Sequence, residues 1–223
     1  MLGLMLRDLL LQKKGLFLSL LLAVVLFPIS SKINIMPHVE TVFGPVLVLF
    51  LFSFSICFGS FMLDEKEHTD IIINSFAFDR KKIVIARYFL AVLTILVFTL
   101  IGILSTVIYS TIIGNAWNEH LIAYAIGPLV AFLMLFIAFP IYFKMGGIGG
   151  QKLAFLAYFA ISFGLPYVFR QSMAVFIKID SSSVLSFIDT SLVKILFFAY
   201  LFICSFGVLS VCISILFYRR REF

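Results

Sequence analysis

Charged residues are scarce in this sequence. They make up 13% of its 223 residues, against about a quarter in soluble globular domains. Hydrophobic residues make up 63%, which is more than a chain of this length can keep from water by folding alone. We therefore expect lipid to be the solvent for much of the chain, and the composition predicts an integral membrane protein.

The formal net charge of +6 does not indicate nucleic-acid binding. A nucleic-acid-binding domain gathers Lys and Arg on one face or stripe. Here the basic residues lie between long apolar runs, so we expect no nucleic-acid partner.

Residues that carry chemistry are also few. Cys57, Cys204 and Cys212 all lie within apolar runs and form no CxxC pair, as small buried hydrophobic residues do. The three His residues lack metal-ligand spacing, so we expect no metal site. The sequence contains no GxxxxGK[ST] motif, and the glycine-rich stretch Lys144–Lys152 is interpreted as a flexible turn. We therefore expect this chain to bind no cofactor and no ATP in the P-loop manner.

Long apolar stretches are the main feature that is present. Six stretches contain no Asp, Glu, Lys or Arg, and they run over Gly15–Ser31, Thr41–Leu63, Tyr88–Asn118, Leu121–Phe143, Leu153–Phe169 and Ile195–Tyr218. A membrane helix needs roughly 17–25 mostly apolar residues, and these stretches lack the alternation of membrane strands. The third stretch is too long for one span, and the pair Gly114-Asn115 is predicted to end its helix.

The predicted fold class is all-α, with one polytopic transmembrane domain over residues 1–223. We predict six spans, at residues 15–31, 41–63, 84–113, 121–143, 153–169 and 195–218. The first span follows a basic approach like that of a signal peptide. However, its exit at Phe27–Lys32 offers no small-residue cleavage site, so we expect it to be retained.

The orientation is predicted from the positions of Lys and Arg, which favour the cytoplasmic side of a membrane. If spans cross alternately, thirteen of the 17 basic residues fall on one side, in the segments before span one, after spans two and four, and after span six. Lys32, Arg170, Lys178 and Lys194 fall on the other side. An even number of spans places both termini on the same side, and the basic residues place that side in the cytoplasm.

Residues 1–14 and 164–190 are each open to two interpretations. Apolar residues at helical spacing in residues 1–14 predict an amphipathic helix at the membrane interface, or an extension of the first span. Pro166 interrupts the end of span five, and an apolar patch and three serines follow. Residues 164–190 are therefore predicted to form short, partly re-entrant helices that cap the outer face, or a plain loop.

The cytoplasmic loop over residues 64–83 changes sign along its length. Acidic residues come first, Arg80–Lys82 come last, and a short apolar helix is predicted between them. Such a helix either packs on its own spans or docks a soluble subunit. The residues expected to contact that subunit are Thr69, Asp70, Ile72, Ile73, Asn74, Ser75, Phe76, Asp79 and Arg80.

The apolar stretches are rich in Phe and carry no charge in the middle, which argues against an ion-coupled transporter. Pro128 and Pro140 are expected to bend the fourth span. Most Phe side chains are expected to face lipid or neighbouring helices. A minority are candidates to line an apolar cavity for a hydrophobic or amphipathic cargo, namely Phe50, Phe54, Phe58, Phe61, Phe132 and Phe136.

At three places the sequence resembles the permease subunits of type-2 ABC exporters, in particular the short six-span half-permeases of bacteria. Leu6–Lys14 resembles the family's amphipathic cytoplasmic helix, and Arg219–Phe223 its basic ending. Residues 64–88, with Asp64-Glu65-Lys66, Asp70–Ser75 and Arg80–Tyr88, resemble its coupling-loop signature. The size and the loop are most similar to permeases that export phenol-soluble modulins or protect against peptide antibiotics.

The chain departs from the family pattern in one place. The family's Ser-Leu-Pro-x-Ser-Arg is here Ser75-Phe76-Ala77-Phe78-Asp79-Arg80, without the proline. Asp in place of the second Ser is still a good N-cap. We therefore predict that Asp79 caps a helix that opens at Arg80.

The resemblance implies a permease in a bacterial cell membrane that exports an amphipathic peptide by alternating access. It also implies two ABC ATPase subunits that carry ATP and Mg, and a second permease, identical or homologous. The chain itself is then not an enzyme. A channel, or a membrane assembly protein without an ATPase partner, is the alternative that the residues alone leave open.

Overall fold

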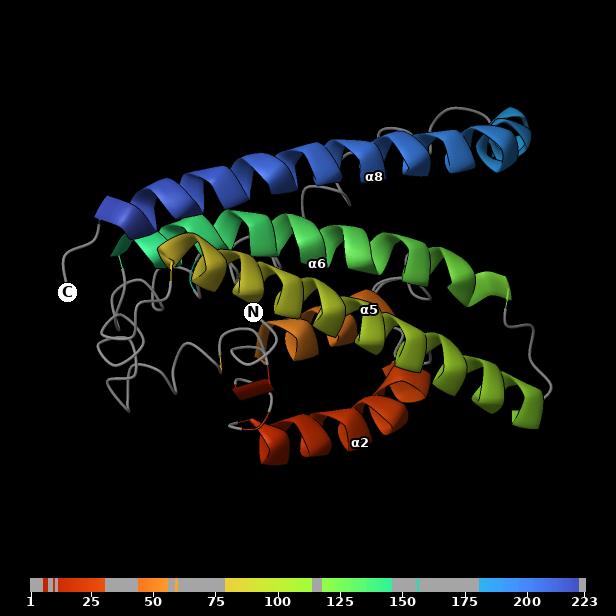
Figure 1. Cartoon of the computed structure of the whole chain (residues 1–223). Helices are drawn as coiled ribbons and strands as arrows, with labels where there is room; N and C mark the ends of the chain where they lie inside the picture. Colours follow the sequence, from red (N-terminus) through yellow and green to blue (C-terminus); the bar gives the residue numbers. More distant parts are fainter. Residues whose placement is uncertain are drawn as a thin grey trace.

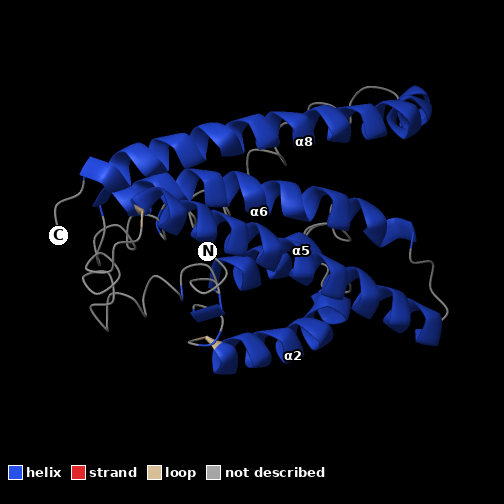
Figure 2. Cartoon of the chain, in the orientation of Figure 1, coloured by secondary structure: helices blue, strands red, loops and turns tan. Residues whose placement is uncertain are grey.

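The computed structural model describes residues 6, 7, 10, 12–30, 44–55, 59, 79–113, 118–145, 156 and 181–220 (Figure 1). Within these residues all regular secondary structure is helical (Figure 2), so the predicted all-α class is confirmed for them. Four long helices are present: α2 (Lys13–Ser30), α5 (Arg80–Ile113), α6 (Asn118–Met145) and α8 (Ser181–Arg220).

These four helices are long and apolar enough to cross a membrane, and they correspond to the first, third, fourth and sixth predicted spans. A shorter apolar helix, Gly44–Ser55, lies within the second predicted span. Of the fifth predicted span, 153–169, only Leu156 is described. Most of the predicted interface helix 1–14, and the coupling loop before residue 79, lie outside the described residues.

Each long helix begins before the first residue of its predicted span: α2 at Lys13 rather than residue 15, α5 at Arg80 rather than 84, α6 at Asn118 rather than 121, and α8 at Ser181 rather than 195. The start of α5 at Arg80 agrees with the predicted Asp79 cap, and the start of α8 differs most from the prediction. Charged residues end an apolar run, but they do not end a helix, because the backbone hydrogen bonds continue through them. The last part of the predicted capping segment 164–190 is therefore the opening of α8, and its part before Ser181 lies outside the described residues.

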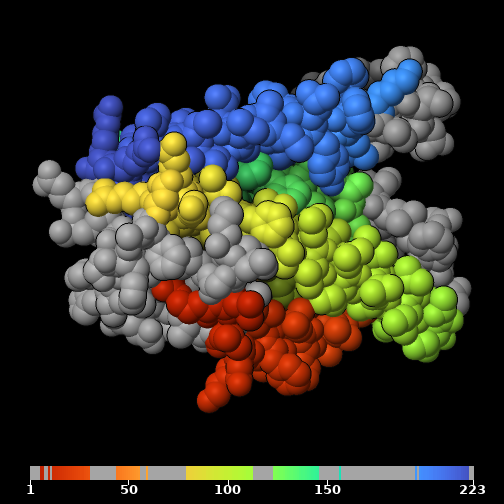
Figure 3. All heavy atoms as spheres, viewed as in Figure 1, coloured from red at the N-terminus to blue at the C-terminus, as the bar shows by residue number. Residues whose placement is uncertain are grey.

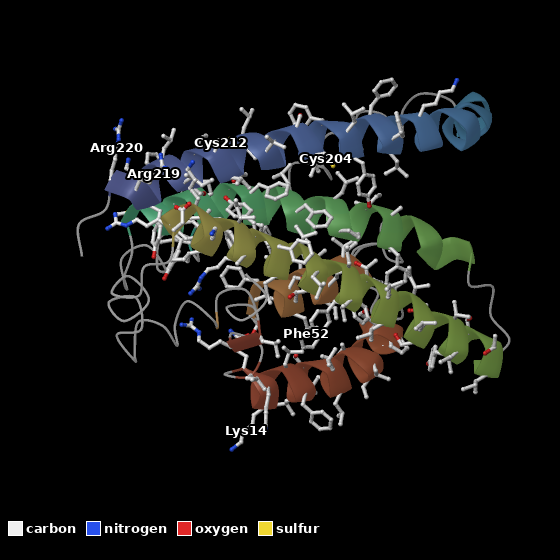
Figure 4. All side chains as sticks on the ribbon, in the orientation of Figure 1. Lys14, Phe52, Cys204, Cys212, Arg219 and Arg220 are labelled. Atoms are coloured by element: carbon white, nitrogen blue, oxygen red, sulfur yellow. The ribbon has the colours of Figure 1, made fainter. Side chains whose placement is uncertain are left out.

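The basic ends of the four long helices lie together at one end of the bundle, which we call the basic end (Figure 4). Lys13 and Lys14 open α2, and Arg80–Lys82 open α5. Lys144 lies in the last turn of α6, and Arg219 and Arg220 end α8. Lys194, near the start of α8, is the exception within the described helices.

Helices α6 and α8 are parallel to each other and antiparallel to α2 and α5 (Figure 1). Helix α6 ends at the basic end, and α8 begins at the opposite end. The chain between Met145 and Ser181 therefore connects the two ends of the bundle.

The core lies between α2, α5, α6 and α8, and its four largest fully buried side chains are all Phe. Phe27 comes from α2, Phe98 from α5, and Phe139 and Phe143 from α6. Helices α2 and α8 form two outer faces of the molecule in the space-filling view (Figure 3). Their outward side chains are large and apolar, which suits lipid contact.

Candidate functional site at the basic end of the bundle

The predicted coupling residues fall on both sides of the boundary of the described structure. Thr69, Asp70, Ile72, Ile73, Asn74, Ser75 and Phe76 lie outside the described residues. Asp79 and Arg80 are described, and they join this segment to the first turn of α5.

Asp79 caps α5, as predicted. Its carboxylate oxygen Oδ1 accepts a hydrogen bond from the amide of Lys81 at 3.1 Å, and its carbonyl accepts one from Lys82 at 2.8 Å. An N-cap of this kind satisfies an amide that the helix leaves open, and its negative charge suits the positive end of the helix dipole. The end of the coupling segment is thereby held against the start of α5.

Arg80 links the start of α5 to the end of α8. Its guanidinium Nη1 donates a hydrogen bond to the carbonyl oxygen of Arg219 at 3.0 Å. The last carbonyls of a helix have no intrahelical partner, and a cation there is favoured by the helix dipole. Arg80 therefore connects the coupling segment with α8 as well as with α5.

Helix α6 is held to the same part of α8. The ammonium of Lys144 lies 5.4 Å from the centre of the Phe217 ring, a cation–π contact. The neighbouring rings of Phe143 and Tyr218 meet edge to face, with centroids 5.4 Å apart. Helices α5 and α6 thus both contact the last turns of α8.

Tyr88 is the centre of this convergence, two turns into α5. Its hydroxyl lies 2.7 Å from Ser210 Oγ and 2.7 Å from Ser214 Oγ, both on α8. Ser210 in turn donates a hydrogen bond to the carbonyl oxygen of Phe136 on α6, at 2.5 Å. One hydroxyl network therefore joins α5, α6 and α8.

Aromatic rings of α6 surround Tyr88. The ring of Phe139 meets it edge to face at 4.8 Å, and those of Phe136 and Phe143 stack with it at 6.1 and 6.4 Å. Phe136 also packs against Gly207, where an added Cβ would lie 2.7 Å from the ring. The absence of a side chain at Gly207 is what allows α6 and α8 to come this close.

The described Phe residues among those predicted to line a cargo cavity pack within the bundle. Phe50 and Phe54 pack with Met134 and Val130 of α6, and Phe54 also packs against the main core cluster. Phe132 and Phe136 stack on each other with centroids 6.1 Å apart. Phe58 and Phe61 lie outside the described residues. The role of these rings in holding a cargo stays a prediction.

Sequence reasoning did not single out Tyr88, Ser210, Ser214 and Gly207. One signal was available: Pro140 lies inside an apolar span and removes a backbone donor there, so another span must supply one. The sequence contains many candidate hydroxyls, and only the packing of α6 against α8 selects Ser210. Among the described residues, no three His, Cys, Asp or Glu side chains gather in a way that would hold a metal ion.

Comparison with known proteins covers almost the whole chain. The family model described as ABC-2 family transporter protein matches residues 3–219. No curated protein and no solved structure matches the chain.

Proposed function

Because this chain belongs to the ABC-2 family of transporter proteins, we propose that it is the permease subunit of an ABC exporter driven by a separate ATPase. The observation that carries this proposal is the family match over residues 3–219, which includes all four of the long helices. The apolar faces of these helices suit a bilayer, and a permease is a membrane transport component rather than an enzyme.

The proposed arrangement in the membrane has six spans, with the basic end and both termini in the cytoplasm of a bacterial cell. The gathering of Lys and Arg at one end of the bundle supports this orientation, because basic residues favour the cytoplasmic side. The parallel directions of α6 and α8 support a further crossing between Met145 and Ser181.

ATPase coupling is assigned to residues 69–80 in this proposal. Thr69–Phe76 dock on an ATPase subunit, and Asp79 and Arg80 pass its movement to α5 and α8. The cap of Asp79 on α5 and the hydrogen bond from Arg80 to Arg219 support the second half of this statement. Two ATPase subunits bind ATP and Mg, and this permease pairs with an identical or homologous one to alternate between inward- and outward-facing states.

The proposed cargo is an amphipathic peptide, such as a cytolytic modulin or an antimicrobial peptide. Phe rings on α6 and on the helix Gly44–Ser55 support an apolar route, and the low charge of the spans suits a cargo with a hydrophobic face. ATP drives net export in this scheme only if its binding favours one of the two states of the permease.

The test replaces both Ile73 and Phe76 with Asp in the permease, co-expressed with its partner ATPase. We expect export of a fluorescent amphipathic peptide to fall at least tenfold, while the thermal unfolding midpoint of the purified permease stays unchanged. The control is Lys81→Gln, an exposed change beyond the docking segment that keeps the Asp79 cap. Full export by the double variant would show that the segment does not dock, and export independent of ATP would indicate a channel.

A further inference from the structure

Pro140 leaves one carbonyl group of α6 without its usual helical partner. In an α-helix the amide of each residue donates to the carbonyl four residues earlier, and proline has no amide hydrogen. The carbonyl of Phe136 therefore receives no hydrogen bond from position 140, although α6 continues through Pro140. Such a carbonyl is costly to leave unsatisfied where water and lipid offer no donor.

Helix α8 supplies the missing donor. The hydroxyl of Ser210 donates to the carbonyl oxygen of Phe136 at 2.5 Å, and Ser210 is only 3% exposed. Gly207, one turn away on α8, makes room for the ring of Phe136. The contact is thus built from three features: a proline on α6, and a serine and a glycine on α8.

The hydrogen positions in the network follow from the fact that each hydroxyl has one hydrogen. Ser210 uses its hydrogen on the Phe136 carbonyl, so the bond between Tyr88 and Ser210 requires Tyr88 to donate. The bond between Tyr88 and Ser214 then requires Ser214 to donate. In this network each of the three hydroxyls donates one hydrogen bond, and the complete network requires α5, α6 and α8 together.

Helices α6 and α8 are joined along their length. Besides the contact of Ser210, the hydroxyl of Tyr200 donates to the carbonyl oxygen of Ala125 at 2.7 Å. The paired residues are 75 and 74 positions apart in the sequence, as two parallel helices in register require. The two bonds therefore oppose sliding of one helix along the other.

Helices α5 and α8 are joined differently. Among the described residues, Arg80 and Tyr88 form hydrogen bonds with α8, and both lie in the first turns of α5. Away from the basic end the two helices diverge, with α6 between them (Figure 1). The contact of α5 with α8 is therefore local, whereas the contact of α6 with α8 is extended.

We propose that Ser210 substitutes for the amide hydrogen that Pro140 lacks, so that α6 and α8 move as one unit, and that Tyr88 is a releasable latch joining α5 to this unit. Opening the latch, together with the Arg80–Arg219 hydrogen bond, separates α5 from α8 at the basic end without exposing the Phe136 carbonyl, because Ser210 stays bound to it. The inference rests on the proposed function only where it assigns this movement to transport.

The first experiment tests whether the Ser210 hydroxyl takes the place of the missing amide donor, by a double-mutant cycle on the purified permease in lipid nanodiscs. Ser210→Ala is expected to lower the thermal unfolding midpoint by about 2–4 °C, because it leaves the Phe136 carbonyl unsatisfied. Pro140→Ala restores an amide to that carbonyl, so Ser210→Ala in this background should cost less than half as much. An equal loss in both backgrounds would overturn the proposal.

Tyr200→Phe is the matched control for this cycle. It also removes an α8 hydroxyl from an α6 carbonyl, but Ala125 keeps the amide of Leu129 as a helical partner. Its effect should therefore be the same with and without Pro140→Ala. If Ser210→Ala alone does not fold, Pro140→Ala must restore folding. If it does not, the proposal that Ser210 substitutes for the missing amide is refuted.

The second experiment tests the latch with spin labels, on a chain in which Cys57 and Cys204 are replaced by Ser and the exposed Cys212 of α8 is kept. A second label is placed on α6 by Met145→Cys, or on α5 by Lys81→Cys. Tyr88→Phe is expected to broaden the α5–α8 distance distribution at least twofold and to leave the α6–α8 distribution unchanged.

The latch is wrong if Tyr88→Phe broadens both distributions equally or leaves the α5–α8 distribution narrow. Ser210→Ala should broaden both, because Ser210 belongs to both contacts. These measurements use the permease alone, whereas the export assay needs the ATPase. A failed latch and a failed assignment as an ABC permease therefore give different results.

Discussion

Helix α6 is held on its two sides by different kinds of contact. On the α8 side, hydroxyl groups of α8 donate to backbone carbonyls of Ala125 and Phe136. On the α2–α5 side, the ring of Tyr124 lies over Gly102 of α5 and next to Phe27 of α2, with the two rings 6.0 Å apart. Each side packs a ring of α6 onto a glycine, Phe136 onto Gly207 of α8 and Tyr124 onto Gly102 of α5, and the α8 side adds hydroxyl groups that donate to backbone carbonyls of α6.

The difference shows how helices associate when lipid is the solvent. Apolar side chains gain little by leaving lipid for another helix, so membrane helices are held together mainly by close packing at small residues and by hydrogen bonds. A hydrogen bond between membrane helices contributes only about 0.6 kcal/mol on average, whereas emptying a packed ring site costs several kcal/mol. We therefore expect the α2–α5 side to supply more stability and the α8 side to set the register.

The largest effect should come from Phe27→Ala, which would break the ring-packed side. Phe27 is fully buried, and its removal leaves a cavity between α2, α5 and α6. The free energy of unfolding should fall by about 3 kcal/mol, measured by denaturant titration in mixed micelles. Phe17→Ala on the same helix is the control, since Phe17 is 70% exposed, and an equal loss there would contradict the proposed packing.

A smaller loss is expected from Gly102→Ala, which fills the notch under Tyr124. The added Cβ would lie 2.6 Å from Cε1 of Tyr124 and 3.1 Å from the Phe27 ring. The Tyr124 ring is held in place by its hydroxyl contact with Thr106, so the clash should cost about 1–3 kcal/mol. The control is Gly15→Ala, whose added Cβ meets nothing within 4 Å, so the free energy of unfolding should stay the same or rise slightly. If both variants lost a similar amount of stability, a specific notch at Gly102 would be ruled out.

The smallest effect should come from Thr106→Val, which keeps the shape of the side chain and removes its hydroxyl. Thr106 and the hydroxyl of Tyr124 form a polar contact on this side of α6, and its loss should cost about 0.6 kcal/mol. The same unfolding titration measures it, with Thr111→Val, an exposed position, as the reference. A loss as large as that of Phe27→Ala would mean that hydrogen bonding governs both sides of α6.

Most of the helices could be predicted because lipid imposes a simple rule on sequence. A span needs an uncharged apolar run. The runs without Asp, Glu, Lys and Arg therefore predicted most ends of α2, α5, α6 and α8 to within a few residues. Asp79 was predictable as the cap of α5 because capping is local, and it depends on a short side chain next to a helix start. The start of α8 was missed, since a helix can extend beyond the apolar run within it.

The candidate site was harder to predict because its contacts join distant parts of the chain. Arg80 was predicted to meet an ATPase, and the structure also places its guanidinium on the carbonyl of Arg219. Tyr88 ends the stretch that resembles the coupling-loop signature, but nothing in that pattern indicates its partners, and nothing in the local pattern separates Ser210 from other hydroxyl residues. Their selection depends on which faces of α5 and α8 meet.

The sequence by itself determined that the chain crosses a membrane as helices, and its resemblance to a permease family agreed with the family match. Scarce charge and long apolar runs leave no other solution, since every buried backbone group must be satisfied within the chain. Only the tertiary structure decided which hydroxyl serves the carbonyl that Pro140 leaves open. Proline creates that need within one helix, but the donor must come from another helix, and only the packing of α6 against α8 brings Ser210 to it.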